Sequence, residues 1–247
     1  MVVAGDCEAL TDVMIKAREA GIKTVSYDRL IQNAGCDLYI SFDNTEVGRL
    51  MARSLLENIP DGGDIFLIQG PLTDHNVTLV REGIDETLAG SSLSVVYESN
   101  CAGWVAENAY TYTKEGLKQD RYVKGIICGN DDLASQAFRA LSEERLAGKV
   151  CVTGQDGDLA ACQRIVEETQ EMTAFKSVEQ EASMAAKCAV LLGLGEEIEE
   201  ARSTAYDGTY QVPYLELQPI AVTGENMDEV IIKGGFHAKE DVYLNVN

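Results

Sequence analysis

Short apolar runs rich in Val, Ile and Leu alternate along this chain with longer amphipathic stretches. The runs predict strands at 22–28, 37–43, 64–70, 93–99, 123–130, 149–156 and 171–177. The stretches between them predict helices at 7–21, 45–59, 76–90, 104–119, 132–148, 158–169 and 178–195. Continuous β-branched runs separated by helices are typical of parallel strands buried on both faces. The pattern therefore predicts an α/β fold with doubly wound parallel sheets, followed by an extended, irregular stretch over 214–236.

Polar or charged side chains follow nearly every predicted strand. In a doubly wound sheet, ligands bind in the crevice at the carboxyl ends of the strands. Asp28, Asn130, Asp156 and Lys176 precede the residue best suited to cap the next helix, so we predict them as ligand contacts. Helix capping is the competing interpretation for the remaining polar residues in these loops. That interpretation applies to Asp43, Thr73, Asp74, Asp131, Asp132 and Asp158.

Composition narrows the classes of protein to consider. The chain has 247 residues and a formal net charge of −21, the opposite of the balance that binds a phosphate backbone, so we expect no nucleic-acid partner. It has no apolar run long enough to span a membrane and no basic segment before an apolar one that would mark a secretory signal. The seven cysteines form no C-x-x-C pair, which argues against a zinc or thioredoxin-like motif.

Catalytic and cofactor motifs are missing from the sequence. We find no phosphate-binding loop, no nucleophile elbow and no dinucleotide fingerprint. The two histidines, His75 and His237, are not spaced for a metal or a catalytic triad, and both are expected at the surface. The Asp-Gly-Asp run at 156–158 offers too few oxygen ligands for a calcium loop. We therefore predict a protein that is not an enzyme and that uses no cofactor and no metal.

Several motifs together resemble a known family. They are VSYDRLI, DLYISFDNTEVGRLMA, GPLTDHNVTLVREG, GWVAENA, GNDDLASQAFRAL, VTGQDGDLAACQRI, TQEMTAFKSV and VIIKGGFHAKE, in this order over nearly the whole chain. The chain resembles the periplasmic sugar-binding proteins of ABC transporters with the type I fold, and among them the D-xylose-binding branch. The resemblance implies two α/β lobes joined by a three-strand hinge, with the sugar enclosed between them. It assigns 1–42 and 177–219 to the N-terminal lobe, and 43–176 and 220–247 to the C-terminal lobe.

The resemblance also implies a set of sugar contacts. They are Asp28 and Arg29 from the first lobe, Asp74 and Asn76 from the second, Trp104 stacked on the sugar, and Asn130, Asp156 and Lys176. These residue types suit the task, because carboxylates accept hydrogen bonds from sugar hydroxyls, Arg and Lys donate them, and an aromatic ring covers the C–H face. Two alternatives stay open: Trp104 packs within the protein, and Asp28 with Arg29 forms a local structural ion pair.

The expected function is non-catalytic binding of a monosaccharide, a pentose and in first place D-xylose, for delivery to an ABC transporter permease. The alternatives are a sugar-sensing co-receptor that docks on a sensor histidine kinase, and the ligand-binding core of a sugar-responsive regulator. The full-length form is expected outside the cytoplasm, in the periplasm or lipid-anchored at the cell surface. The chain begins where the family has its third strand, so the first lobe is expected to be incomplete and sugar binding weaker than in a full-length relative.

Overall fold

The computed structural model describes residues 1–246, and the chain divides into two compact units. Unit 1 consists of Met1–Asn44, Thr73–Thr78 and Ser177–Pro219. Unit 2 consists of Thr45–Leu72, Leu79–Lys176 and Ile220–Asn247. The expected lobes placed 73–78 in the second lobe, whereas in the structure this segment groups with unit 1.

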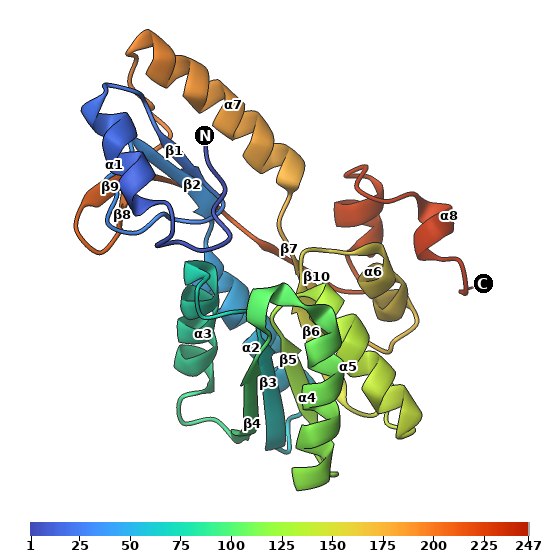
Figure 1. Ribbon diagram of the computed structural model, residues 1–247. Helices are drawn as coiled ribbons and strands as arrows, with labels where there is room; N and C mark the ends of the chain where they lie inside the picture. The colour runs from blue at the N-terminus through green and yellow to red at the C-terminus, as the bar shows by residue number, and fades with distance from the viewer. Residues whose placement is uncertain (247) are drawn as a thin grey trace. The chain divides into compact units, whose positions relative to one another are not determined.

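Unit 1 is a four-stranded sheet with a helix on each face. Its elements are α1 (Thr11–Glu19), β1 (Val25–Tyr27), β2 (Leu38–Phe42), α7 (Val178–Leu194), β8 (Ser203–Tyr206) and β9 (Gln211–Leu217). The strand order is β1-β2-β9-β8, in which the first three strands are parallel and β8 is an antiparallel edge strand. Alternate residues of β2 point to opposite faces: Leu38 and Ile40 pack with α7, and Tyr39 packs with Met14 of α1. The two helices lie on opposite sides of this sheet (Figure 1).

Strand β8 was not predicted, because it is an exposed edge strand without a buried apolar run. The turn that joins β8 to β9 contains Asp207 followed by Gly208, a pair that favours hairpin turns. Asp207 is fully buried and accepts backbone N–H groups of Thr209 and Tyr210 in its own turn at 2.9 and 2.7 Å. It also accepts the N–H groups of Ala34 and Gly35 at 3.0 and 2.7 Å, which fastens the turn to the 33–36 loop.

Unit 2 is built on a six-stranded sheet of order β10-β7-β6-β5-β3-β4. The strands are β3 (Gly63–Gln69), β4 (Leu93–Asn100), β5 (Gly125–Cys128), β6 (Cys151–Gln155), β7 (Met172–Phe175) and β10 (Ile220–Val222). The helices are α2 (Asn44–Asn58), α3 (His75–Leu88), α4 (Ala106–Gln119), α5 (Asp131–Glu143), α6 (Leu159–Val166) and α8 (Lys239–Val242). All strand pairs are parallel except β7 with the edge strand β10.

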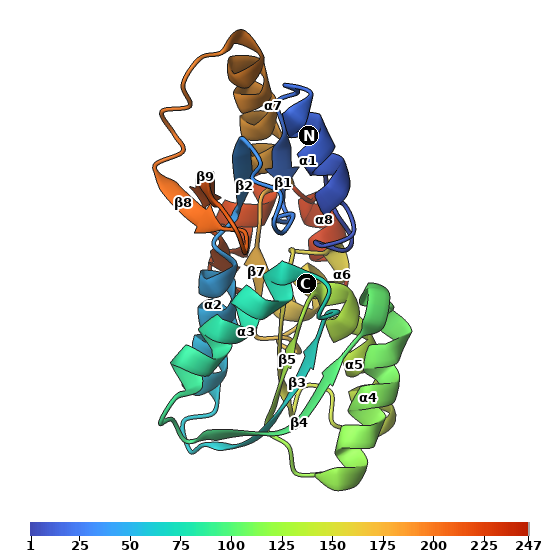
Figure 2. The ribbon, with the colours of Figure 1, turned by 60° about the vertical axis from the view of Figure 1, so that its left-hand side comes forward.

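Helices cover both faces of the unit 2 sheet, as the doubly wound pattern predicted. Helices α2 and α3 lie on one side of the sheet, and α4 and α5 lie on the other (Figure 2). Ile65 and Leu67 of β3 pack toward α2 and α3, while Phe66 and Ile68 pack toward α4 and α5. Because the strands are parallel, their carboxyl ends lie along one edge of the sheet, where the polar loop residues gather.

The stretch over 214–236 is less irregular than expected. It contains β9, β10 and a short helical turn, η2 (Asp228–Ile232), and it is followed by α8. The apolar residues Met227, Ile231 and Val242 are buried against Phe175 and α6, so packing on the sheet edge orders a segment that has little periodicity of its own. Within residues 1–246, none of the helices is both long enough and apolar enough to serve as a membrane span.

Candidate functional site

Four predicted contact residues come together in unit 1, and we call them the unit 1 cluster: Asp28, Arg29, Asp74 and Asn76. The Arg29 guanidinium bridges two carboxylates, with Nη1 2.6 Å from Asp28 Oδ2 and Nε 2.6 Å from Asp74 Oδ2. Asn76 Nδ2 donates to the backbone oxygen of Asp28 at 3.0 Å. The ion pair between Asp28 and Arg29, left open as an alternative, is therefore present.

The two carboxylates of the unit 1 cluster differ in exposure. The Asp74 side chain is 1% exposed, and its Oδ1 accepts Asn76 N–H in the first turn of α3, so Asp74 also performs the capping role considered from the sequence. The Asp28 side chain is 21% exposed and Arg29 is 24% exposed, so both offer polar atoms to the surroundings. Burial lowers the pKa of Arg29, but the carboxylates of Asp28 and Asp74 together raise it by more. The net shift is therefore upward, and the guanidinium stays charged.

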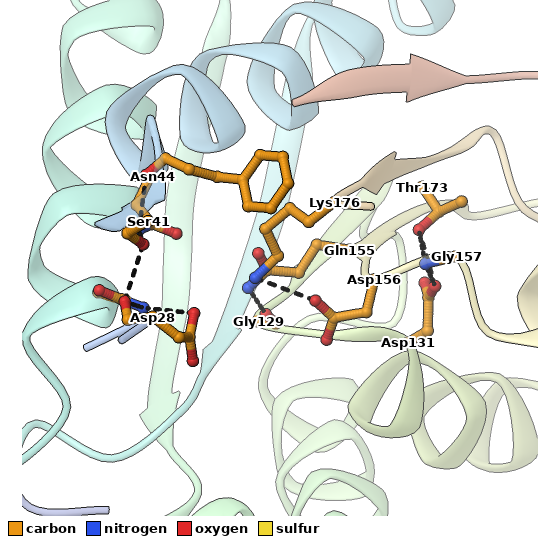
Figure 3. A network of polar contacts seen from close by, with 12 residues as sticks. Asp28, Ser41, Asn44, Gly129, Asp131, Gln155, Asp156, Gly157, Thr173 and Lys176 are labelled. Carbon is orange, nitrogen blue, oxygen red and sulfur yellow. Dashed lines mark hydrogen bonds and ion pairs between the residues drawn. The ribbon is translucent and has the colours of Figure 1, made fainter. Parts of the chain in front are cut away.

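Ser41 supports the conformation of Asp28. Asp28 has a φ of 63°, in the left-handed region that few non-glycine residues adopt. Ser41 Oγ donates to the Asp28 backbone oxygen at 2.8 Å, and Asn44 Nδ2 lies 3.2 Å from the same Ser41 oxygen (Figure 3). Residues of β2 and of the start of α2 therefore fix the backbone from which the Asp28 carboxylate projects.

Asp156 and Lys176 form the second group of predicted contacts, in unit 2. Lys176 Nζ lies 3.0 Å from Asp156 Oδ1 (Figure 3). The Asp156 side chain is 40% exposed and that of Lys176 is 16% exposed. Asp156 follows β6, and Lys176 follows the neighbouring strand β7, so the pair stands at the carboxyl edge of the sheet. One carboxylate acceptor and one ammonium donor are thus held together where a doubly wound fold binds ligands.

The reasoning that selected Asn130 was wrong in one respect. Asn130 is itself the N-cap of α5, and its side-chain oxygen accepts Leu133 N–H at 2.9 Å. Asp131 and Asp132, the caps that the sequence suggests, both lie inside the helix. The Asn130 side-chain oxygen is therefore committed to the helix, and what this residue offers a ligand is its amide N–H groups.

Trp104 packs against its own unit. The side chain is half-buried at the edge of the cluster formed by Phe66, Ile68 and the helices α4 and α5. The indole lies over Gly70, where a Cβ atom would come within 2.3 Å of the ring. The packing alternative is therefore realised in the structure, while the residue as a whole is only partly buried.

Two buried glutamines at the carboxyl edge were missed from the sequence. Gln69 and Gln155 are 2% and 5% exposed, and Gln155 Nε2 donates to the backbone oxygen of Gly129 (Figure 3). In the register of the sheet Gln155 pairs with Ala174, so it shares a face with Lys176, two residues further along.

The other reactive groups show no second centre of chemistry. Within residues 1–246, no group of three or more His, Cys, Asp or Glu side chains is arranged to hold a metal ion. The seven cysteines are unpaired thiols, and burial raises the pKa of those in the sheet, Cys128 and Cys151. His237, expected at the surface, is half-buried, with Nε2 2.8 Å from the Gly157 backbone oxygen.

Comparison with known proteins places this fold in a family. Residues 1–197 match the periplasmic binding protein domain. The chain is 40% identical over 98% of its length to the D-xylose-binding periplasmic protein of Haemophilus influenzae, covering 74% of that protein. It is 38% identical over 95% of its length to the D-xylose-binding periplasmic protein of Escherichia coli K12, covering 72% of it. The chain therefore belongs to the periplasmic binding protein family, and it is a binding protein rather than an enzyme.

Solved structures confirm the fold. An ABC transporter solute-binding protein from Clostridium phytofermentans with bound β-D-glucose superposes with a TM-score of 0.87 at 24% identity, over 96% of this chain and 80% of that one. A carbohydrate transporter solute-binding protein from Chloroflexus aurantiacus in complex with D-glucose gives a TM-score of 0.85 at 26% identity, over 96% of this chain and 78% of that one. The expected type I architecture of two α/β lobes is thus the architecture of this chain, and each of its sheets, predicted as parallel, carries one antiparallel edge strand.

Proposed function

We propose that this protein binds a monosaccharide, D-xylose in first place, and delivers it to the permease of an ABC transporter. The observation that carries the proposal is the identity of 40% and 38% to two D-xylose-binding periplasmic proteins over nearly the whole chain. The same relatives support a location outside the cytoplasm. The comparisons give no support to the sensor-kinase or regulator alternatives, and we do not propose them.

The residue types of the two polar groups support a sugar as ligand. A sugar hydroxyl both donates and accepts hydrogen bonds, so its partners must include acceptors and donors. Asp28 and Asp156 supply carboxylate acceptors, while Arg29 and Lys176 supply charged donors. Hydrogen bonds to charged groups are the stronger kind, and each ion pair holds its side chains in a defined geometry before a ligand arrives. We propose that these residues, together with Asn76, Asn130 and the exposed part of Trp104, contact the sugar.

The choice of sugar is the finer part of the proposal. Proteins of the same architecture carry other ligands, such as D-allose in the protein from Actinobacillus succinogenes, so the fold alone does not select a pentose. The selection rests on the xylose-binding relatives. Titration calorimetry with D-xylose, D-ribose, D-glucose and D-allose tests it, and we expect D-xylose to bind most tightly. Tighter binding of a hexose would contradict the pentose proposal and leave sugar binding intact.

Lys176→Met tests the contribution of the polar pair. The variant keeps a long apolar side chain and removes the donor, so we expect the affinity for D-xylose to fall by roughly a hundredfold, as for loss of a charged hydrogen bond of about 3 kcal/mol. Lys187→Met is the matched control, because Lys187, a residue of α7, forms an exposed ion pair with Glu200. Equal affinities of the two variants would show that Lys176 does not contact the sugar.

A further inference from the structure

A fully buried carboxylate lies beneath the Asp156 loop in unit 2. Asp131, the first residue of α5, is 0% exposed although it carries a charge-bearing side chain. Its Oδ2 accepts hydrogen bonds from Gly157 N at 2.9 Å, Asp158 N at 3.1 Å and Thr173 Oγ1 at 2.7 Å. Gly157 and Thr173 lie beside Asp131 in Figure 3. The Oδ1 atom of Asp131 accepts from Gln170 Nε2 at 3.1 Å. Two of these four donors are backbone groups of the loop that carries Asp156.

The loop over 156–158 has a backbone that needs such support. Asp156 has a φ of 99° and Gly157 a φ of 78°, so two successive residues occupy the positive-φ region. A non-glycine residue held there is strained, and it persists only where the surrounding structure holds it. Gly157 N also lies 3.1 Å from Thr173 Oγ1, and a Cβ atom at Gly157 would come within 2.7 Å of the Phe175 ring.

The unusual backbone decides where the Asp156 carboxylate points. Along a regular strand, Asp156 would face away from the side shared by Gln155 and Lys176. The positive φ breaks this alternation, and Asp156 Oδ1 lies 3.0 Å from Lys176 Nζ. The geometry points to Asp131 as a positioning residue, whose buried carboxylate holds the 156–158 loop in the conformation that brings Asp156 to Lys176. Asp131 contacts no ligand in this role and acts through the loop.

Other polar groups around Asp131 provide a control. Gln170 Oε1 accepts from Arg164 Nε at 2.9 Å, and Arg164 Nη1 donates to Ser135 Oγ at 3.0 Å. These hydrogen bonds connect to Asp131 through its Oδ1 atom, and none of them involves the backbone N–H of Gly157 or of Asp158. Gln170→Met therefore disturbs the same buried network without removing a bond to the loop, whereas Thr173→Val removes a hydroxyl that bonds both the carboxylate and Gly157.

The test compares Asp131→Asn, Thr173→Val and Gln170→Met with the wild type at mildly alkaline pH. Amide hydrogen exchange measured by NMR on the sugar-free protein reports the anchoring. We expect exchange at Gly157 and Asp158 to become roughly tenfold faster in Asp131→Asn and Thr173→Val, as for loss of one charged hydrogen bond, with the central strands unchanged. Gln170→Met is expected to keep wild-type exchange at these two amides, even where it lowers the midpoint of unfolding.

The second readout is affinity for D-xylose, which rests on the proposed function. We expect Asp131→Asn to weaken binding by roughly tenfold or more, and Gln170→Met to preserve it. Unchanged exchange at Gly157 and Asp158, a loss of protection spread over the whole sheet, or unchanged affinity despite a loosened loop would each overturn the positioning role. A wild type that binds no sugar overturns the proposed function instead, and the exchange data still decide whether Asp131 anchors the loop.

Discussion

Titration of Asp131 gives the sharpest prediction about stability. The pKa of the Asp131 carboxyl is raised to about 7, chiefly by burial and also by the neighbouring carboxylates Asp156 and Asp158, and the hydrogen bonds from Thr173 and Gln170 oppose this rise. The ordinary pKa of an Asp side chain is about 3.9. Over the pH range between these two values, the folded protein keeps the proton that the unfolded chain has released.

The sign of the pH dependence follows from this difference in proton binding. Because the folded state binds more protons between about pH 4 and about pH 7, the free energy of unfolding falls as the pH rises through this range. A shift of about 3 pKa units corresponds to about 4 kcal/mol at 1.36 kcal/mol per unit. Since the side chain is fully buried, screening by solvent reduces this figure little. Above about pH 7 the contribution of Asp131 no longer changes.

Urea denaturation of the wild type and of Asp131→Asn, repeated from about pH 4.5 to about pH 8, measures the effect. Asparagine keeps the shape of the side chain and does not titrate. We therefore expect the wild type to lose about 3 to 4 kcal/mol relative to the variant as the pH rises. Parallel curves for the two proteins would refute the reasoning, because they would mean that Asp131 titrates alike in the folded and unfolded states. The pKa of Asp158 is also raised by burial. Its contribution is present in both proteins, so it is removed when the free energies of unfolding of the wild type and the variant are subtracted at each pH.

Three further predictions concern the scaffold around the polar groups. Asp207→Ala removes the acceptor of four backbone N–H groups, so we expect it to lower the free energy of unfolding by about 3 kcal/mol; a change below about 1 kcal/mol in urea denaturation would contradict this. Gly70→Ala places a Cβ atom 2.3 Å from the ring of Trp104, the single tryptophan, so its emission is expected to shift toward that of exposed indole. Gly193→Ala, with open space at its Cβ position, should leave the emission unchanged. Ser177→Ala removes the side-chain cap of α7, which accepts Gln180 N–H, and is expected to cost about 1 kcal/mol, whereas an unchanged melting curve would show that the cap contributes nothing.

The order of strands and helices was predictable because a strand that is buried on both faces has a continuous run of apolar residues. Strands such as β3 and β5 read as continuous apolar runs, since helices cover both sides of them. The same logic failed for β8, whose residues are mostly exposed at the edge of the unit 1 sheet. There the only local signal was the Asp-Gly pair at 207–208, and its significance depends on contacts with the distant residues Ala34 and Gly35.

The strand-end positions of the polar groups were predictable, but among their pairings only that of Asp28 with Arg29 could be considered from the sequence. Local sequence gave no reason for Arg29 to meet Asp74, because the two lie 45 positions apart and meet only when 73–78 packs onto unit 1. The family resemblance named both residues and placed them in different lobes. The structure shows them bonded within one compact unit, so Arg29 has a structural partner regardless of any ligand.

Asp131 shows why residue type alone did not separate a cap from an anchor. Asn130, Asp131 and Asp132 all suit the start of a helix, and nothing in their order indicates which one is buried. The structure assigns the cap to Asn130, leaves Asp132 exposed and turns Asp131 inward to the 156–158 loop. Strand alternation holds up to Gln155, and it fails at Asp156 because the Asp131 carboxylate, at the start of α5, binds the backbone of a loop with a positive φ. The direction of a polar side chain at the end of a strand therefore depends on buried polar partners that are remote in the sequence, and such partners are found by asking where each buried carboxylate obtains its hydrogen bonds.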